Sequence, residues 1–163
     1  MQTILIVYHS ATGGTRQMVE AALAGARDEP QVETRLLHAD AADSAAVLAA
    51  DGYLFATPEN LAAISGVLKH FFDRTYYQVL DRVVGRPYAA MVCAGSDGSN
   101  AARQIERIAT GWRLKPIAPS LIVCTRAQAP EEILRPKRLE AADLQRCRDL
   151  GATLAGGLAL GVF

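Results

Sequence analysis

The chain has 163 residues, of which 50% are hydrophobic and 21% charged, and its 17 basic side chains balance 17 acidic ones. This length suits a single domain spanning residues 1–163, and the composition excludes a disordered tail and an electrostatic nucleic-acid binder. No apolar stretch reaches the roughly 18–20 residues of a membrane-spanning helix, and the N-terminus lacks the pattern of a secretory signal. We therefore expect a cytoplasmic protein without membrane insertion.

Five strand-like apolar runs alternate with segments of helical spacing, at residues 3–8, 32–37, 52–57, 88–94 and 119–124. Four of the runs are continuously hydrophobic, as buried parallel strands are, whereas the second alternates like an edge strand. The pattern predicts an α/β fold, an open, doubly wound sheet of five parallel strands in the order 2-1-3-4-5.

The segments between these runs carry apolar residues on one helical face. The predicted faces contain Met18, Ala22 and Ala26; Ile64, Leu68, Phe71, Phe72 and Thr75; Ile105 and Ile108; and Leu139, Cys147, Leu150, Leu154 and Leu158. A short alanine-rich helix is expected within 41–50, and the longest loop within 126–136, which contains two prolines.

The three cysteines, Cys93, Cys124 and Cys147, form no CxxC pair and are odd in number. This argues against a disulfide framework and a zinc site. We expect all three to be small buried hydrophobic residues, and we expect no metal ligands.

Three loops at the predicted carboxyl ends of the first, third and fourth strands are candidates for a binding site, because ligands of such sheets bind where the strand order reverses. They are HSATGGT at 9–15, TPEN at 57–60 and CAGSDGSN at 93–100. The first loop brings three hydroxyls and two glycines to the predicted start of a helix, where free N–H groups and the helix dipole favour a phosphate. Ordinary helix capping would explain one of these hydroxyls but not three.

Other phosphate loops fit poorly. A Walker loop requires a Gly-Lys-Ser/Thr ending, and the dinucleotide fingerprint requires GxGxxG, whereas here the adjacent pair Gly13 and Gly14 leads into Thr15 and Arg16. A receiver domain would place acidic residues at the ends of the first and third strands, where this chain has His9, Ser10 and Thr57. No GxSxG motif is present.

The spacing Ser10-x-Thr12-Gly13-x-Thr15 resembles the FMN-phosphate loop of flavodoxins. The stretch TPENLAAISGVLKHFFDRTYY at 57–77 is similar to the second flavin loop and the following helix of flavodoxin-like NAD(P)H-dependent flavin and quinone reductases. The stretch at 93–100 resembles their third loop. The resemblance covers nearly the whole chain and implies a flavodoxin-like three-layer sandwich that binds FMN.

The resemblance implies that all three loops contact the flavin, and that the cofactor rather than a protein acid or base carries the chemistry. The candidate cofactor-binding residues are Ser10, Ala11, Thr12, Gly13, Gly14 and Thr15 in the first loop, Thr57, Pro58, Glu59 and Asn60 in the second, and Ala94, Gly95, Ser96 and Gly98 in the third. His9, Arg16 and Asp97 could also reach the cofactor or its substrate, or could be structural, and we assign no catalytic residue.

Electron-carrier flavodoxins are acidic and cover the flavin ring with aromatic side chains. This chain has no net charge, and no aromatic residue lies between Phe55 and Phe71 or between Tyr88 and Trp112. An open flavin face favours stacking of NADH or NADPH for hydride transfer. We therefore expect an FMN-binding oxidoreductase that passes electrons to a quinone, a flavin or a similar small acceptor.

Two alternatives remain at this point. One is a flavodoxin-type electron-transfer protein without NAD(P)H reductase activity, and the other is a scaffold that has lost its flavin. The resemblance also allows a homodimer or larger homo-oligomer, with Tyr76 and Tyr77 as candidate contact residues.

Overall fold

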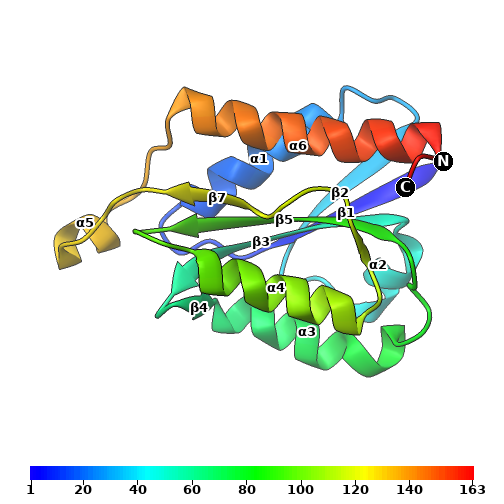
Figure 1. The fold of residues 1–163 in the computed structure, drawn as a ribbon, viewed down its shortest axis with the longest axis horizontal. Helices are drawn as coiled ribbons and strands as arrows, with labels where there is room; N and C mark the ends of the chain where they lie inside the picture. Colours follow the sequence, from blue (N-terminus) through cyan, green and yellow to red (C-terminus); the bar gives the residue numbers. More distant parts are fainter.

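The computed structural model describes residues 1–163 as a sheet between two layers of helices (Figure 1). The strands are β1 (Gln2–Tyr8), β2 (Val32–His38), β3 (Gly52–Asn60), β4 (Ala63–Ile64), β5 (Pro87–Ala94), β6 (Lys115–Pro116) and β7 (Leu121–Cys124). The helices are α1 (Gly14–Ala26), α2 (Ser44–Ala49), α3 (Gly66–Val79), α4 (Ser99–Gly111), α5 (Pro130–Leu134) and α6 (Ala141–Leu160). None of these helices is long and apolar enough to cross a bilayer.

The sheet order confirms the predicted topology. Parallel strands run in the order β2-β1-β3-β5, and β6 and β7 both pair in parallel with the outer side of β5. The alternating strand β2 lies at the edge, where one of its flanks is unpaired. The five main strands therefore follow the order 2-1-3-4-5, with β6 and β7 sharing the fifth position.

Two short elements differ from the sequence-based expectation. Strand β3 continues through the TPEN stretch to Asn60 and forms an antiparallel hairpin with β4, so TPEN is a strand end rather than a loop. Ile64, assigned to a helical face, is in β4, and Leu139 precedes α6. The expected loop at 126–136 contains α5.

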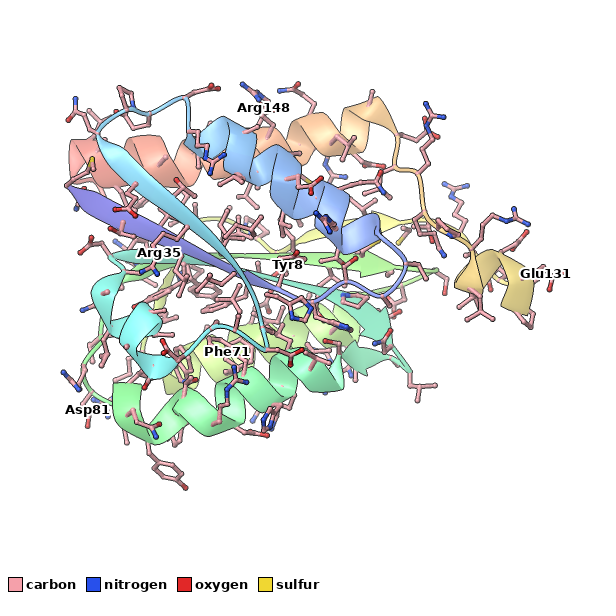
Figure 2. All side chains as sticks on the ribbon, turned by 180° about the vertical axis from the view of Figure 1, so that it is seen from behind. Tyr8, Arg35, Phe71, Asp81, Glu131 and Arg148 are labelled. Atoms are coloured by element: carbon pink, nitrogen blue, oxygen red, sulfur yellow. The ribbon has the colours of Figure 1, made fainter.

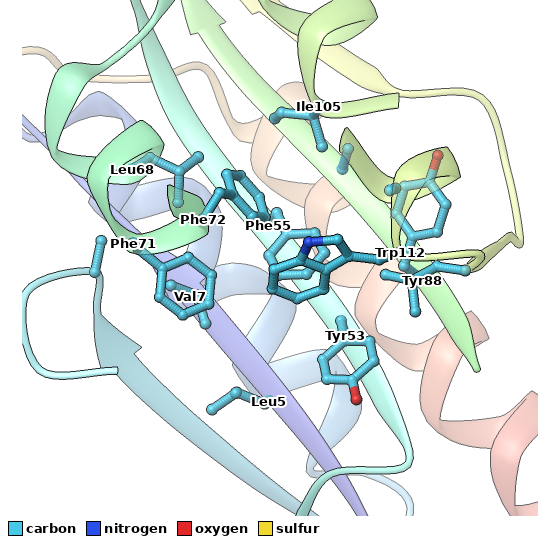
Figure 3. Close-up of a cluster of buried hydrophobic side chains, with 14 of the residues drawn as sticks. Leu5, Val7, Tyr53, Phe55, Leu68, Phe71, Phe72, Tyr88, Ile105 and Trp112 are labelled. Carbon is cyan, nitrogen blue, oxygen red and sulfur yellow. The ribbon is translucent and has the colours of Figure 1, made fainter. Parts of the chain in front are cut away.

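Helices α1 and α6 cover one face of the sheet, and α2, α3 and α4 cover the other (Figure 1). The cluster under α2–α4 contains the chain's large buried aromatic side chains, with Phe55 at its centre (Figure 3). The ring of Phe55 lies 5.0 Å from that of Phe72 and 6.1 Å from that of Trp112. These aromatic side chains are therefore part of the hydrophobic core.

One surface expectation, the burial of all three cysteines, needs correction, whereas the candidate contact residues Tyr76 and Tyr77 remain a prediction. Cys93 and Cys147 are buried as expected, but Cys124, the last residue of β7, is exposed. Tyr76 packs partly against the core, whereas Tyr77 is 81% exposed.

Candidate functional site

The carboxyl ends of β1, β3, β5 and β7 meet at one edge of the sheet, around an open cavity of about 250 Å³. The cavity is lined by Ser10, Ala11, Thr12, Gly14 and Thr15 after β1, Pro58, Glu59 and Asn60 at the end of β3, Cys93, Ala94 and Gly95 at the end of β5, and Thr125, Ala127, Ile133, Leu134 and Lys137 after β7. None of these residues is aromatic.

The first loop presents free hydrogen-bond donors at the start of α1. Gly13 adopts a left-handed conformation, with φ of 90°, and caps the helix without a side-chain hydrogen bond. The Ser10 hydroxyl accepts hydrogen bonds from the N–H groups of Gly13 (3.2 Å) and Arg16 (3.3 Å). The N–H groups of Thr12, Gly14 and Thr15 bond to nothing in the protein, so they are free to bind an anion at the positive end of the helix dipole.

The Thr15 side chain adds a donor to the same place. Thr15 is only 1% exposed, and its Oγ1 has no hydrogen-bond partner. A buried polar atom without a partner costs free energy unless a ligand satisfies it. Because Thr15 lines the cavity, a polar group of a ligand bound there would satisfy this hydroxyl.

Gly14 allows the first loop to lie close to β5. A Cβ atom at this position would lie 2.5 Å from the Cys93 Sγ, so a larger residue would require the Cys93 side chain to shift. Burial raises the pKa of the Cys93 thiol to about 11. Cys93 is therefore a neutral packing residue under the loop, and not a nucleophile at neutral pH.

The second and third loops are joined to each other. The Glu59 carboxylate accepts a hydrogen bond of 2.7 Å from the N–H of Gly98, the residue that precedes α4. Asn100 donates through Nδ2 to the carbonyl of Ala62 at 2.6 Å. These two bonds hold the β3–β4 hairpin against the start of α4.

The structure brings most of the predicted cofactor-binding residues to the cavity, but four of them do not line it. These four are Gly13, Thr57, Ser96 and Gly98. Thr57 is fully buried, and its hydroxyl accepts a hydrogen bond of 2.9 Å from the Ser65 N–H. Gly13 and Gly98 instead precede α1 and α4, where they shape the starts of the two helices without lining the cavity.

The three further candidates from the sequence, His9, Arg16 and Asp97, also do not line the cavity. The His9 ring packs edge-on against His38, 5.5 Å away, on the β2 side of the first loop. Arg16 forms an exposed ion pair of 2.8 Å with Glu20. The Asp97 carboxylate binds the N–H (3.3 Å) and hydroxyl (2.9 Å) of Ser99 at the start of α4.

Sequence reasoning missed the segment after β7. Lys137 donates its backbone N–H to the Thr12 carbonyl at 2.8 Å. The Gln17 amide donates to the carbonyls of Gly13 (2.9 Å) and Lys137 (2.7 Å) and accepts from the N–H of Leu139 (3.1 Å). These contacts join segments about 120 residues apart, and the only local signal was the pair of prolines in 126–136.

Comparison with known families identifies the class of protein to which this chain belongs. Residues 3–128 match the model of the family described as NADPH-dependent FMN reductase. The chain belongs to this family. This membership confirms FMN as the expected cofactor, and the family description names NADPH as the reductant.

The chain is a member of the NADPH-dependent FMN reductase family, and several proteins similar to it are named flavodoxins. A protein named flavodoxin from Aquifex aeolicus is 34% identical over 98 residues, which cover 60% of this chain and 53% of that protein, so the match spans about half of the relative. Among solved structures, a flavodoxin from the domain Archaea has a TM-score of 0.81 at 20% identity, covering 97% of this chain and 99% of that one. A flavodoxin, WrbA-like protein from Agrobacterium tumefaciens has a TM-score of 0.77 at 20% identity, covering 98% and 99%. These structural likenesses confirm the flavodoxin-like fold.

The first loop fits the phosphate group of FMN. The free N–H groups of Thr12, Gly14 and Thr15, together with the unpartnered Thr15 hydroxyl, are the kind of donor set that a phosphate dianion requires. No carboxylate is among the cavity-lining residues of this loop.

Proposed function

We propose that the protein is an FMN-dependent oxidoreductase that accepts hydride from NADPH or NADH and passes electrons to a quinone, a free flavin or a similar small acceptor. The observation that carries the proposal is the absence of any aromatic side chain from the cavity lining. A flavin held in this cavity keeps a face open to a flat nicotinamide or quinone. The bound FMN would supply the two-electron redox chemistry.

In this proposal the first loop holds the phosphate. The N–H groups of Thr12, Gly14 and Thr15 and the Thr15 hydroxyl donate to its oxygens, and Ser10 keeps the loop in shape by accepting from Gly13 and Arg16. These groups bind and orient the cofactor without exchanging protons with it.

The second and third loops contact the edge of the flavin ring. Pro58, Asn60, Ala94 and Gly95 line the cavity without an aromatic or charged side chain, which leaves room for the edge of the flavin ring. Glu59 holds the two loops together through Gly98, so its carboxylate serves to position the loops.

The alternative is a flavodoxin-type electron-transfer protein without reductase activity of its own. The name of the Aquifex aeolicus relative favours it. The two functions differ in one property, since only the reductase is reduced directly by a nicotinamide nucleotide.

The test is anaerobic stopped-flow reduction of the FMN-loaded protein by NADPH and by NADH, followed by the visible absorbance of the flavin. We expect saturable bleaching with at least one nucleotide. Dithionite is the control that establishes that the bound flavin can be reduced. Bleaching by dithionite but by neither nucleotide would reject the reductase and leave the electron carrier.

A further inference from the structure

The segment from Thr125 to Lys137, here called the arm, projects from the end of β7 and returns to α6. Its helix α5 contributes no buried residue and lies beyond the edge of the sheet (Figure 1). Glu131 is at the outer end of α5, away from the body of the molecule (Figure 2). The family match ends at residue 128, so α5 lies outside the matched region.

Hydrogen bonds rather than burial hold the arm in place. At its base, Lys137 is bonded to Thr12 and Gln17. The Lys137 ammonium donates to the carbonyls of Glu132 (2.9 Å), Ile133 (2.7 Å) and Arg135 (2.7 Å), which closes the end of α5. The arm is therefore tied to the same loop that carries the free donors for a phosphate.

The arm carries two large apolar side chains that remain exposed to solvent. Ile133 is 50% exposed and Leu134 is 76% exposed, and both line the cavity. The other apolar side chains on the cavity are smaller, namely those of Ala11, Pro58, Cys93, Ala94 and Ala127. Ile133 and Leu134 are thus the residues that offer substantial aliphatic surface to a ligand there.

We propose that the arm is a fourth wall of the flavin site, and that Ile133 and Leu134 pack against the apolar surface of the bound flavin. This inference rests on the proposed FMN binding. Covering exposed aliphatic carbon with a flavin ring removes apolar area from water on both partners, which favours binding. Because Lys137 bonds to Thr12, the same segment that carries these side chains is positioned relative to the phosphate-binding loop.

The test is a double variant, Ile133→Ser with Leu134→Ser, titrated with FMN and with riboflavin and followed by flavin fluorescence. Riboflavin has the ring without the phosphate, so it isolates contacts to the ring. We expect both dissociation constants to rise by about ten-fold or more, and by similar factors.

The matched control is Leu160→Ser with Val162→Ser. These side chains are 79% and 64% exposed, and they lie at the C-terminal end, on the opposite side of the molecule from α5 (Figure 1). The control should bind both flavins like the unmodified protein. Thermal melting followed by circular dichroism verifies that both variants are folded.

The outcomes separate the two proposals. If the unmodified protein binds neither flavin, FMN binding is rejected and the arm inference with it. If the unmodified protein binds FMN and the arm variant binds both flavins equally well, the arm inference alone is overturned. Weaker FMN binding with unchanged riboflavin binding overturns it too, because the arm would then act on the phosphate. A change in oligomeric state at unchanged flavin affinity would instead make the arm a contact between copies of this chain.

Discussion

At the scale of single residues, Thr15 is the side chain through which we propose that the first loop binds its ligand. Its buried hydroxyl has no partner, and the residue lines the cavity beside free N–H groups. Thr34 on β2 also has a buried hydroxyl without a partner, but it is not on the cavity lining. A comparison of substitutions at the two threonines therefore distinguishes an effect on ligand binding from the general effect of removing an unsatisfied buried hydroxyl.

We predict that Thr15→Val weakens FMN binding by about 10- to 150-fold, since a hydrogen bond to a charged group contributes roughly 1.5–3 kcal/mol. Riboflavin binding should not change. The measurement is the dissociation constant of each flavin by fluorescence titration, with Thr34→Val as the matched control. Equal loss of affinity in both valine variants would mean that the effect arises from folding and not from the phosphate.

His9 makes the stability of the fold depend on pH. Burial, with a smaller contribution from His38, lowers the pKa of His9 from its ordinary value of 6.5. The unfolded chain therefore binds more protons at His9 than the folded chain as the pH falls below 6.5, so His9 increasingly destabilises the folded state below that pH and does not do so above it. Denaturant midpoints measured between pH 8 and pH 5 should fall less steeply for His9→Gln than for the unmodified protein. Parallel pH curves would contradict this assignment.

The three cysteines should differ in reactivity. Burial raises the pKa of Cys93 to about 11 and that of Cys147 to about 12, whereas Cys124 is exposed. In the native protein we expect a chromogenic disulfide reagent to titrate one thiol rapidly and the other two after denaturation. The Cys124→Ser variant should show no rapid phase. A rapid phase that persists in this variant would mean that one of the buried thiols is accessible.

At the scale of the elements, α1 and α6 pack closely because glycines lie between them. A Cβ atom at Gly151 would lie 2.0 Å from the Ala22 carbonyl oxygen, whereas a Cβ atom at Gly156 on the same helix meets nothing within 4 Å. Close backbone contact of this kind does not tolerate an added methyl group without separation of the helices.

We predict that Gly151→Ala lowers the free energy of unfolding by about 3 kcal/mol through overpacking. Gly156→Ala should raise it by about 0.5–1 kcal/mol, because alanine loses less backbone entropy in a helix than glycine. Chemical denaturation of the two variants gives both values. Similar stabilities of the two variants would show that the helices can separate at little cost.

The main strands and their order could be predicted from the sequence, because buried parallel strands require continuous apolar runs. The β3–β4 hairpin could not, since its turn places Leu61 and Ala62 in the left-handed conformation, with φ of 50° and 60°, without the usual glycine or asparagine. The three loops of the candidate site could be located from the strand ends. The arm could not, because its position depends on Gln17 contacts with residues 120 or more positions away.

At the scale of the whole molecule, the aromatic residues that pack the core are not among those that line the candidate cavity. The aromatic side chains fill the core under α2–α4, and the cavity at the sheet edge is left with small residues, free donors and the aliphatic arm. The balanced charge, with 17 basic and 17 acidic side chains, gives no overall field to attract a charged redox partner. Both features are consistent with small-molecule substrates that approach an open flavin face.

The central claim is that the start of α1 binds the phosphate of FMN, and the most direct test is the ratio of the riboflavin and FMN dissociation constants of the unmodified protein. Several hydrogen bonds to a phosphate dianion should make FMN bind about 100-fold tighter than riboflavin, or more. Equal affinities for the two flavins, or no binding of FMN, would contradict the account.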